Sequence, residues 1–328
     1  MYILASGVVI MKILITDKMA DEAIQVLKDA GHNVTYDEMD GDTLMKEIPE
    51  YDALMVRSRT KAVTEIVKAG AGGNLKVIGR AGVGVDNIDI ETAAKHGIKV
   101  VNSPTGSTQS VAELAVAHML SLARFIPKAD CSMKKGEWIK KQLRGFELNG
   151  KTLGLIGSGH IAQHVAKIGQ GFNMNVLVYS PHCTDEKAEK MGATRVDLEE
   201  LLKKSDFVSL HIPHTKESHY LLNEKTLSLM KPGAYLINCA RGGVVDENAL
   251  YNALKEGKIA GAAVDVFETE PANKDNKLLS LDNVVFSPHI GASTKEAQIR
   301  AGTITAEQIL KVLNGEEPDF WVNKKYFN

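Results

Sequence analysis

Three short segments of the sequence each carry a charged or protonatable side chain directly after an apolar run. They contain Arg241 in NCARGG (238–243), Glu270 in ETEP (268–271) and His289 in SPHIGA (287–292). A guanidinium can hold a carboxylate through two parallel hydrogen bonds and polarise a carbonyl group. An imidazole can take up or return a proton, and a neighbouring carboxylate favours its charged form and fixes the ring. Together these residues could bind a small acid and move its hydroxyl proton.

These side chains meet only if the elements before them are neighbouring parallel strands. Apolar runs at Ala234–Asn238, Ala260–Val264 and Val284–Ser287 precede them, and a helical pattern such as Asp246–Glu256 lies between two of these runs. This alternation predicts a parallel sheet covered by helices. Ligands of such sheets bind beyond the carboxyl ends of the strands. Singly, each residue has an ordinary structural explanation, such as a surface ion pair or a solvated turn, but their joint placement predicts one site.

The preceding stretch, Lys151–Pro181, has the order strand, glycine turn, helix, strand. Thr152–Ile156 and Val176–Tyr179 are the two predicted strands, and a helix is predicted from about Ala162 to Gly171. In this unit Gly157 permits a tight turn, and Gly159 lets a pyrophosphate approach the backbone at the helix N-terminus. Ala162 stands where a third glycine is usual. The flanking strands make the pattern a predicted dinucleotide site, and with the three side chains above it predicts 2-hydroxy-acid oxidation by a nicotinamide cofactor.

Bulk properties narrow the class of protein. The chain has 328 residues, enough for two domains, with 44% hydrophobic and 24% charged residues, as in globular proteins. A net charge of −2 gives no indication of nucleic acid or of an anionic membrane surface as a partner. Three cysteines without CxxC spacing argue against a disulfide framework and a metal site, and fit a cytoplasmic location. No apolar run approaches the ~20 residues that span a bilayer.

The remaining chain predicts a second α/β domain. Strands are expected at Lys12–Thr16, Ala53–Val56, Val77–Ile78 and Lys99–Val101, and helices at Asp21–Asp29 and Val63–Lys68. A last helix, Thr294–Leu313, follows a break and is expected to return to this first domain. The prediction is two Rossmann-like or flavodoxin-like parallel-sheet domains with a cleft between them. A discontinuous substrate domain takes 11–106 and 293–328, a dinucleotide domain takes 107–292, and residues 1–10 are an extension before Met11.

One long helix is expected from Gln109 to Lys134, because Val111, Leu114 and Leu122 recur at helical spacing. It is more apolar around its circumference than a surface helix, which predicts packing between domains or against a second subunit, hence a homodimer. The alternative is that it is buried within one subunit.

From Met11 to about Leu313 the sequence resembles the D-isomer-specific 2-hydroxyacid dehydrogenases. The family's catalytic arginine, glutamate and histidine match Arg241, Glu270 and His289 in order and spacing. Upstream, VRSRTK (56–61), GRAGVGVDNID (79–89), NSPTGSTQSVAELA (102–115) and ELNGKTLG (147–154) resemble the branch that acts on 3-phospho-D-glycerate. The resemblance implies NAD-dependent oxidation of that acid to 3-phosphohydroxypyruvate, the first step of L-serine biosynthesis, by a homodimer paired through its dinucleotide domains.

The resemblance also implies contacts, residue by residue. Positions expected at the cofactor are Val83, Gly157, Gly159, His160, Ile161, Ser180, Ile212, Pro213, Cys239, Ala240, Arg241, Asp265, His289, Gly291 and Ala292. Positions expected at the substrate are Arg57, Ser58, Arg80, Gly82, Val83, Lys140 and Lys141, of which the basic ones would meet its phosphate.

Two features depart from the family. Ser180 stands where the second strand normally ends in aspartate, a residue that binds the ribose hydroxyls and repels a 2′-phosphate. NAD remains the expected cofactor, and NADP is not excluded because serine does not repel that phosphate. The sequence also ends at residue 328, whereas longer phosphoglycerate-oxidising members carry a serine-binding domain after this point. We accordingly expect no inhibition by L-serine through such a domain.

Alternatives remain at this point. Within the family, reduction of glyoxylate or hydroxypyruvate differs by the absence of a substrate phosphate. Formate dehydrogenases carry glutamine at the position of Glu270 and are disfavoured. In another class, the same fold and triad serve NADH-sensing corepressors, against which the upstream motifs argue.

Overall fold

The computed structural model describes residues 2–3 and 9–327, and the chain divides into two compact units. Unit 1 comprises Met1–Ser107 and Ala292–Asn328, and unit 2 comprises Thr108–Gly291. The prediction that residues 1–10 are an extension falls largely on residues outside the described part. Within that part, β1 (Tyr2–Ile3) pairs with β2 (Val9–Ile10) in antiparallel fashion.

Unit 2 is built on a parallel sheet that brings its loops to one edge. Among the described residues the strand order is β10 (Thr194–Arg195), β9 (Asn175–Tyr179), β8 (Thr152–Ile156), β11 (Phe207–Leu210), β12 (Tyr235–Asn238), β13 (Gly261–Val264) and β14 (Val284–Phe286). Leu210 is in register with Ile156 and Asn238, and Asn238 with Val264. Because these strands end level with one another, the segments after them share one edge of the sheet.

Helices cover both faces of this sheet because successive strand residues point to opposite sides. On one face α5 (Thr108–Arg124) and α7 (His160–Gly171) pack with strand residues such as Leu153 and Leu155. On the other face, α9 (Leu198–Lys204), α10 (Glu224–Leu227) and α11 (Glu247–Lys255) pack with Ile156 and Val208. The short α8 (Asp185–Lys190) follows β9. The two apolar layers fix the sheet and therefore the edge that carries the candidate side chains.

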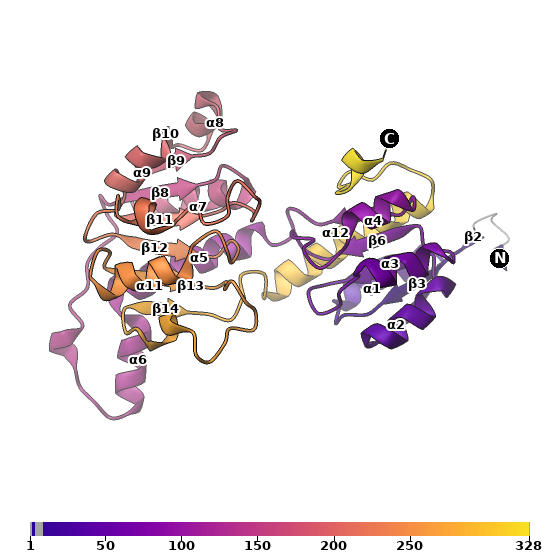
Figure 1. Ribbon diagram of the computed structural model, residues 1–328, viewed down its shortest axis with the longest axis horizontal. Helices are drawn as coiled ribbons and strands as arrows, with labels where there is room; N and C mark the ends of the chain where they lie inside the picture. Colours follow the sequence, from indigo (N-terminus) through magenta and orange to yellow (C-terminus); the bar gives the residue numbers. More distant parts are fainter. Residues whose placement is uncertain (1, 4–8, 328) are drawn as a thin grey trace. The chain divides into compact units, whose positions relative to one another are not determined.

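The prediction of a single helix from Gln109 to Lys134 is wrong. The chain forms α5 and then α6 (Ile126–Lys134), with a bend of 65° between their axes. Phe125 at the break has the left-handed φ of 54°, and Pro127 has no N–H to continue the ladder of α5. α5 is packed in the core, whereas α6 projects from the sheet of unit 2 (Figure 1). No single described helix is long and apolar enough to cross a membrane. The bent pair of α5 and α6 together has the length and composition of a membrane span, but these two properties alone are weak evidence for one.

Unit 1 contains a second parallel sheet. Its order within the described residues is β4 (Asn33–Tyr36), β3 (Lys12–Ile15), β5 (Ala53–Val56), β6 (Val77–Arg80) and β7 (Lys99–Asn102). α1 (Asp21–Asp29) and α12 (Lys295–Leu313) pack on one face, and α2 (Gly41–Glu47), α3 (Thr64–Ala71) and α4 (Ile90–Lys95) on the other. The yellow C-terminal helix lies beside the indigo and purple strands in Figure 1.

The close approach of α12 to its sheet explains one small residue. A Cβ on Gly79 of β6 would lie 2.6 Å from the Ile309 side chain, so a larger residue would push the helix away. Thr294 caps this helix by accepting the Ala297 N–H at 3.0 Å. Short 3₁₀ turns complete the chain at Ile48–Glu50, Lys140–Gln142, Lys277–Ser280 and Lys324–Tyr326. The two parallel sheets with flanking helices confirm the predicted α/β class.

Candidate active site

His289 and Glu270 form a direct pair at the sheet edge of unit 2. His289 Nδ1 lies 2.6 Å from Glu270 Oε2, and the two side chains are 48% and 37% exposed. The other carboxylate oxygen, Oε1, accepts the Phe267 N–H at 3.1 Å. His289 adopts a left-handed φ of 52°, which is uncommon for a residue with a side chain. The imidazole is therefore held through one ring nitrogen, and its orientation is tied to Glu270.

Opposing effects act on the Glu270 carboxyl group. Burial acts to raise its pKa, whereas the hydrogen bonds from His289 and from the Phe267 N–H, and the charges of His289 and Arg241, lower it. The lowering effects prevail, so the pKa of Glu270 lies below its ordinary value. At neutral pH Glu270 is consequently a carboxylate that can stabilise a protonated imidazole.

Arg241 lies in the loop that follows β12 and packs on the segment leading to Glu270. A Cβ on the next residue, Gly242, would stand 1.9 Å from the Phe267 carbonyl oxygen, so only glycine permits this approach. The Asn238 amide donates to the Arg241 carbonyl at 3.1 Å, and Arg241 Nη1 donates to the Ala240 carbonyl at 2.7 Å. The charge of Arg241 also acts on the Glu270 carboxyl group, and all three predicted catalytic residues belong to unit 2.

Asp265 anchors the segment that carries His289. It follows β13, is 1% exposed, and its carboxylate accepts the Ile290 N–H at 2.9 Å and the Gly291 N–H at 3.0 Å. Its carbonyl oxygen accepts the His289 N–H at 2.8 Å. Asp265 was expected at the cofactor, and the structure shows that both carboxylate oxygens are engaged by the histidine loop.

The glycine turn after β8 has the shape that a pyrophosphate requires. Gly157 has a φ of 115°, and a Cβ there would lie 2.3 Å from the His211 carbonyl oxygen. A Cβ on Gly159 would meet no atom within 4 Å, so the backbone is open at the point where α7 begins with His160. The first N–H groups of a helix lack intrahelical partners and favour an anion. The residues present therefore fit the phosphates of a dinucleotide.

Other residues predicted at the cofactor follow the same strands. Ser180 comes directly after β9, and its Oγ is 3.4 Å from the His182 N–H. Ile212 and Pro213 follow β11, and Cys239 and Ala240 follow β12. Burial raises the pKa of the Cys239 thiol well above its ordinary value, and the charge of Asp265 raises it further. The Cys239 thiol is thus neutral at physiological pH and is not a nucleophile.

In unit 1, hydrogen bonds with two other segments hold the loop that contains Arg57 and Ser58. The buried Asp17 carboxylate accepts the N–H of Arg57 and, at 2.7 Å, the hydroxyl of Thr60. The Asn87 amide donates to the carbonyl groups of Arg57 at 2.8 Å and of Thr60 at 2.7 Å. An ion pair of 3.2 Å between Arg59 and Asp17 further stabilises the conformation of this loop. Sequence reasoning missed Asp17 and Asn87, although the position of Asp17 directly after the β3 run was a usable signal.

The remaining predicted substrate residues lie on neighbouring segments. Arg80 ends β6, and its guanidinium covers Gly82, where a Cβ would lie 1.5 Å from Nη1 and where φ is 156°. The Val83 carbonyl accepts the Asn102 amide at 2.7 Å. Lys140 and Lys141 belong to unit 2, in the 3₁₀ turn beyond α6. Parallel pairing of β5 with β6 brings Arg57 and Arg80 to the same edge of the unit 1 sheet.

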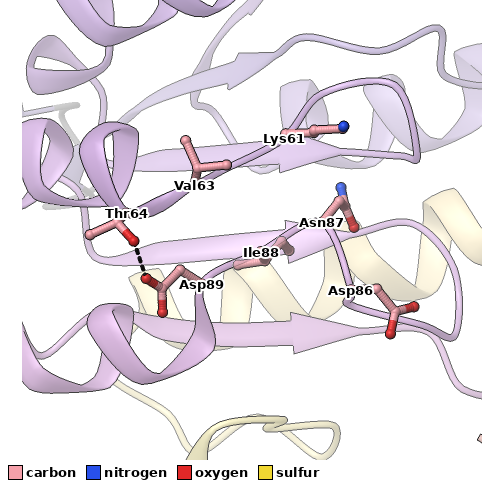
Figure 2. Close-up of a pocket in the computed structure, with 7 residues that line it drawn as sticks. All are labelled: Lys61, Val63, Thr64, Asp86, Asn87, Ile88 and Asp89. Carbon is pink, nitrogen blue, oxygen red and sulfur yellow. Dashed lines mark hydrogen bonds between the residues drawn. The ribbon is translucent and has the colours of Figure 1, made fainter. Parts of the chain in front are cut away.

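A cavity of about 470 Å³ lies on the flank of the Arg57 loop in unit 1. It is lined by Lys61, Val63, Thr64, Asp86, Asn87, Ile88 and Asp89, and Figure 2 shows the hydrogen bond from Thr64 to Asp89 on its wall. Its lining includes none of the residues predicted at the substrate. Among the residues that the structure describes, no three His, Cys, Asp or Glu side chains gather as metal ligands.

Comparison with known proteins places this geometry in a family. The sequence model of the NAD-binding domain of D-isomer specific 2-hydroxyacid dehydrogenases matches residues 116–291. The D-3-phosphoglycerate dehydrogenase of Methanocaldococcus jannaschii is 51% identical over 95% of this chain, which spans 59% of the length of that relative. The hydroxypyruvate reductase of Thermotoga maritima is 48% identical over 92% of this chain and 98% of its own length.

A solved structure gives the same result at the level of the fold. The TT0316 protein of Thermus thermophilus is 35% identical and superposes with a TM-score of 0.85, covering 95% of this chain and all of that one. The chain belongs to the D-isomer specific 2-hydroxyacid dehydrogenase family, and its unit 2 carries the NAD-binding domain of that family.

Proposed function

We propose that this protein oxidises 3-phospho-D-glycerate to 3-phosphohydroxypyruvate with NAD, and catalyses the reverse reduction. The observation that carries the proposal is the hydrogen-bonded pair of His289 and Glu270, within an NAD-binding domain that also contains Arg241. Similarity to the Methanocaldococcus jannaschii D-3-phosphoglycerate dehydrogenase supports the substrate assignment.

Each side chain has a defined task in this reaction. Arg241 holds the substrate carboxylate and polarises the C2 oxygen. Because Nδ1 of His289 is engaged by Glu270, Nε2 is the ring nitrogen that accepts the C2 hydroxyl proton during oxidation and returns it during reduction. Glu270 stabilises the imidazolium so formed. The bound nicotinamide supplies the hydride chemistry.

The cofactor assignment follows from the glycine turn. Gly157, Gly159 and the N-terminus of α7 at His160 and Ile161 would hold the pyrophosphate, and Ser180 would face the adenosine ribose. A serine at this position neither binds both ribose hydroxyls nor repels a phosphate. We infer that NAD is used and that NADP is accepted to a measurable degree.

The substrate phosphate would be met by basic residues. In unit 1 Arg80 ends β6, and Arg57 directly follows the neighbouring strand β5. Arg57 Nη1 donates to the Lys18 carbonyl at 3.3 Å. Lys140 and Lys141 are the further candidates in unit 2. The hydrogen bonds of Asp17 and Asn87 to the backbone of Arg57 support a role of Arg57 in phosphate binding, because they fix the loop that carries its side chain.

The assembly we propose is a homodimer. Ile126 and Met133 of α6 are 54% and 56% exposed, and Trp138 in the segment that follows is 78% exposed. Large apolar side chains exposed on one projecting segment are typical of an interface. Sedimentation velocity at micromolar concentration tests the proposal, and a monomer would refute it. The free cysteines Cys131, Cys183 and Cys239 fit the reducing cytoplasm, which is the location we propose.

A second candidate function is reduction of hydroxypyruvate or glyoxylate. The observation that favours it is the Thermotoga maritima hydroxypyruvate reductase, which this chain matches over 98% of its length. The two reactions use the same triad and differ in whether the substrate carries a phosphate.

A substrate panel separates the two functions. We expect kcat/KM to be highest for 3-phosphohydroxypyruvate among that acid, hydroxypyruvate and glyoxylate, assayed with NADH and with NADPH. Arg57→Ala should lower kcat/KM about tenfold or more for the phosphorylated acid and much less for the others, because each charged hydrogen bond contributes ~1.5–3 kcal/mol. Equal effects on all three acids would show that the phosphate is not recognised and would favour the second candidate.

A further inference from the structure

A buried histidine in α5 has no part in the reaction described above. His118 is 5% exposed, and its neighbours on the inner face of the helix, Ala115, Met119 and Leu122, are apolar. An imidazole at such a place loses its hydration and needs a hydrogen-bond partner to offset that cost. Its partner is the Ser287 hydroxyl, 2.9 Å from His118 Nε2, although 169 positions separate the two residues.

The direction of the hydrogen bonds can be assigned along this chain of residues. Ser287 donates its only hydroxyl proton to Asp265 Oδ1 at 2.6 Å. Its oxygen therefore accepts from His118, so His118 carries a hydrogen on Nε2. Burial lowers the pKa of His118, and the charge of Asp265 opposes this only in part. The ring is thus a neutral donor at physiological pH.

This series of hydrogen bonds leads to the loop of His289. Asp265 receives the N–H groups of three consecutive residues, His289 on its carbonyl and Ile290 and Gly291 on its carboxylate. Ser287 precedes His289 by two residues, so both ends of this short segment are fixed to Asp265. This attachment holds His289 at its left-handed φ, from which its ring reaches Glu270.

We propose that His118 is a positioning residue for His289, acting through Ser287 and Asp265. The inference rests on the proposed role of His289 as the acid–base group. His118 touches neither substrate nor cofactor in this account. It supplies the donor that saturates Ser287, which leaves the Ser287 proton directed at Asp265 and the histidine loop in one conformation.

Three variants test the proposal in the full-length protein. His118→Leu removes the donor, His118→Gln places an amide N–H near the position of Nε2, and Met119→Leu changes only packing on the same helix. We expect His118→Leu to lower kcat for ketoacid reduction about three- to tenfold, with the Kd of NADH unchanged, because one hydrogen bond in the positioning chain is lost. His118→Gln should recover most of the rate, and Met119→Leu should match wild type.

A double-mutant cycle shows whether the effect travels through Ser287. If it does, Ser287→Ala and the double variant His118→Leu, Ser287→Ala should have the same kcat, because the connection is already broken. Independent, additive losses would overturn the proposal, as would a wild-type kcat in His118→Leu or no recovery in His118→Gln. Should His118→Leu fail to fold, the glutamine and Ser287→Ala variants still give the answer.

Failure of the proposed function would be recognised separately. If the wild-type protein reduces no 2-oxo acid, the proposed function is wrong, whatever the results with the variants. The inference then remains testable by NMR of ring-labelled histidine. The His289 ring signals should shift in His118→Leu and return in His118→Gln, and unchanged signals in all variants would refute the proposal.

Discussion

His289 Nδ1 lies 2.6 Å from Glu270 Oε2, and a second oxygen of the same carboxylate is held by the Phe267 N–H. One carboxylate thus ties together the loops that follow β13 and β14. In the proposed reaction Nε2 of the imidazole, which takes no part in this pair, meets the substrate, and the pair keeps a negative charge beside the ring.

Replacing Glu270 should change the pH dependence of the reaction. Glu270→Gln removes the charge that favours the imidazolium. Because reduction needs the protonated ring, we expect the rate, as the pH is raised, to begin to fall at a lower pH than in wild type. We expect the alkaline limb of kcat against pH to move down by about one unit or more. Glu268→Gln is the matched control, because Glu268 bonds to the Tyr220 hydroxyl at 3.1 Å and to the Glu247 N–H at 3.0 Å. An unmoved limb in Glu270→Gln would contradict this role.

Cofactor choice should respond to the residue after β9. Ser180→Asp introduces a carboxylate that can accept the ribose hydroxyls of NAD and repel the 2′-phosphate of NADP. The ratio of kcat/KM for NAD to that for NADP should rise about tenfold or more, since each ~1.4 kcal/mol is a factor of ten. Ser180→Ala adds no charge and should leave the ratio near its wild-type value. If the aspartate leaves the ratio unchanged, Ser180 does not face the ribose.

The loop of Arg57 should lose its shape without Asp17. In Asp17→Asn an amide group would face the N–H groups of Arg57 and Thr60 that the carboxylate now accepts. KM for the phosphorylated substrate should rise about tenfold, with little change in kcat or in NADH affinity. Asp52→Asn is a control at the amino-terminal edge of the same sheet, where Asp52 accepts the Lys12 N–H at 2.9 Å and pairs with Lys76 at 3.0 Å. Equal KM values in the two variants would argue against a positioning role.

Stability in acid should depend on Asp89 in unit 1, one of the residues labelled in Figure 2. Hydrogen bonds from the Thr64 hydroxyl and from the Thr92 N–H and hydroxyl lower the pKa of Asp89 to about 2. Because the folded-state pKa is depressed, this stabilisation is complete above about pH 3.8 and is lost as the pH falls through about 2. Asp89→Asn should therefore unfold about 0.3–1 kcal/mol more easily at pH 7, and the difference should shrink towards pH 2.

Urea titrations followed through Trp321 fluorescence give this comparison, because Trp321 bridges to Val101 in unit 1. A difference between wild type and Asp89→Asn that stays constant from pH 7 to pH 2 would show that the charge of Asp89 is not involved.

Much of the fold was predictable because the strands are short buried runs. Ala53–Val56 and Thr152–Ile156 were predicted with the bounds that they have in the structure. The exposed edge strands β4 and β10 and the short α4 were not predicted, since such segments show little apolar periodicity. The break at Phe125 was missed because the apolar pattern continues across it and Pro127 is tolerated in the first turn of α6.

For the candidate site too, some residues were predictable from the sequence and others were not. Arg241, Glu270 and His289 could be proposed from sequence because each lies within six residues of the end of a predicted parallel strand. The residues that hold them in place could not, because their contacts are remote in sequence. Asp17 meets Arg57 across 40 positions and His118 meets Ser287 across 169, and no spacing rule links such pairs. The pairing of the unit 1 strands and the packing of α5 on the unit 2 sheet bring them together.

The role of His289 as the proton donor is tested by single-turnover hydride transfer from bound NADH to 3-phosphohydroxypyruvate, in wild type and in His289→Asn. Asparagine removes the proposed proton donor and leaves the glycine turn, where we propose that the cofactor binds, unchanged. We predict a rate about 10²–10⁴-fold lower in the variant, with a much smaller change in the Kd for NADH. Equal rates in the two proteins would contradict it, because His289 would then not be the group that moves the proton.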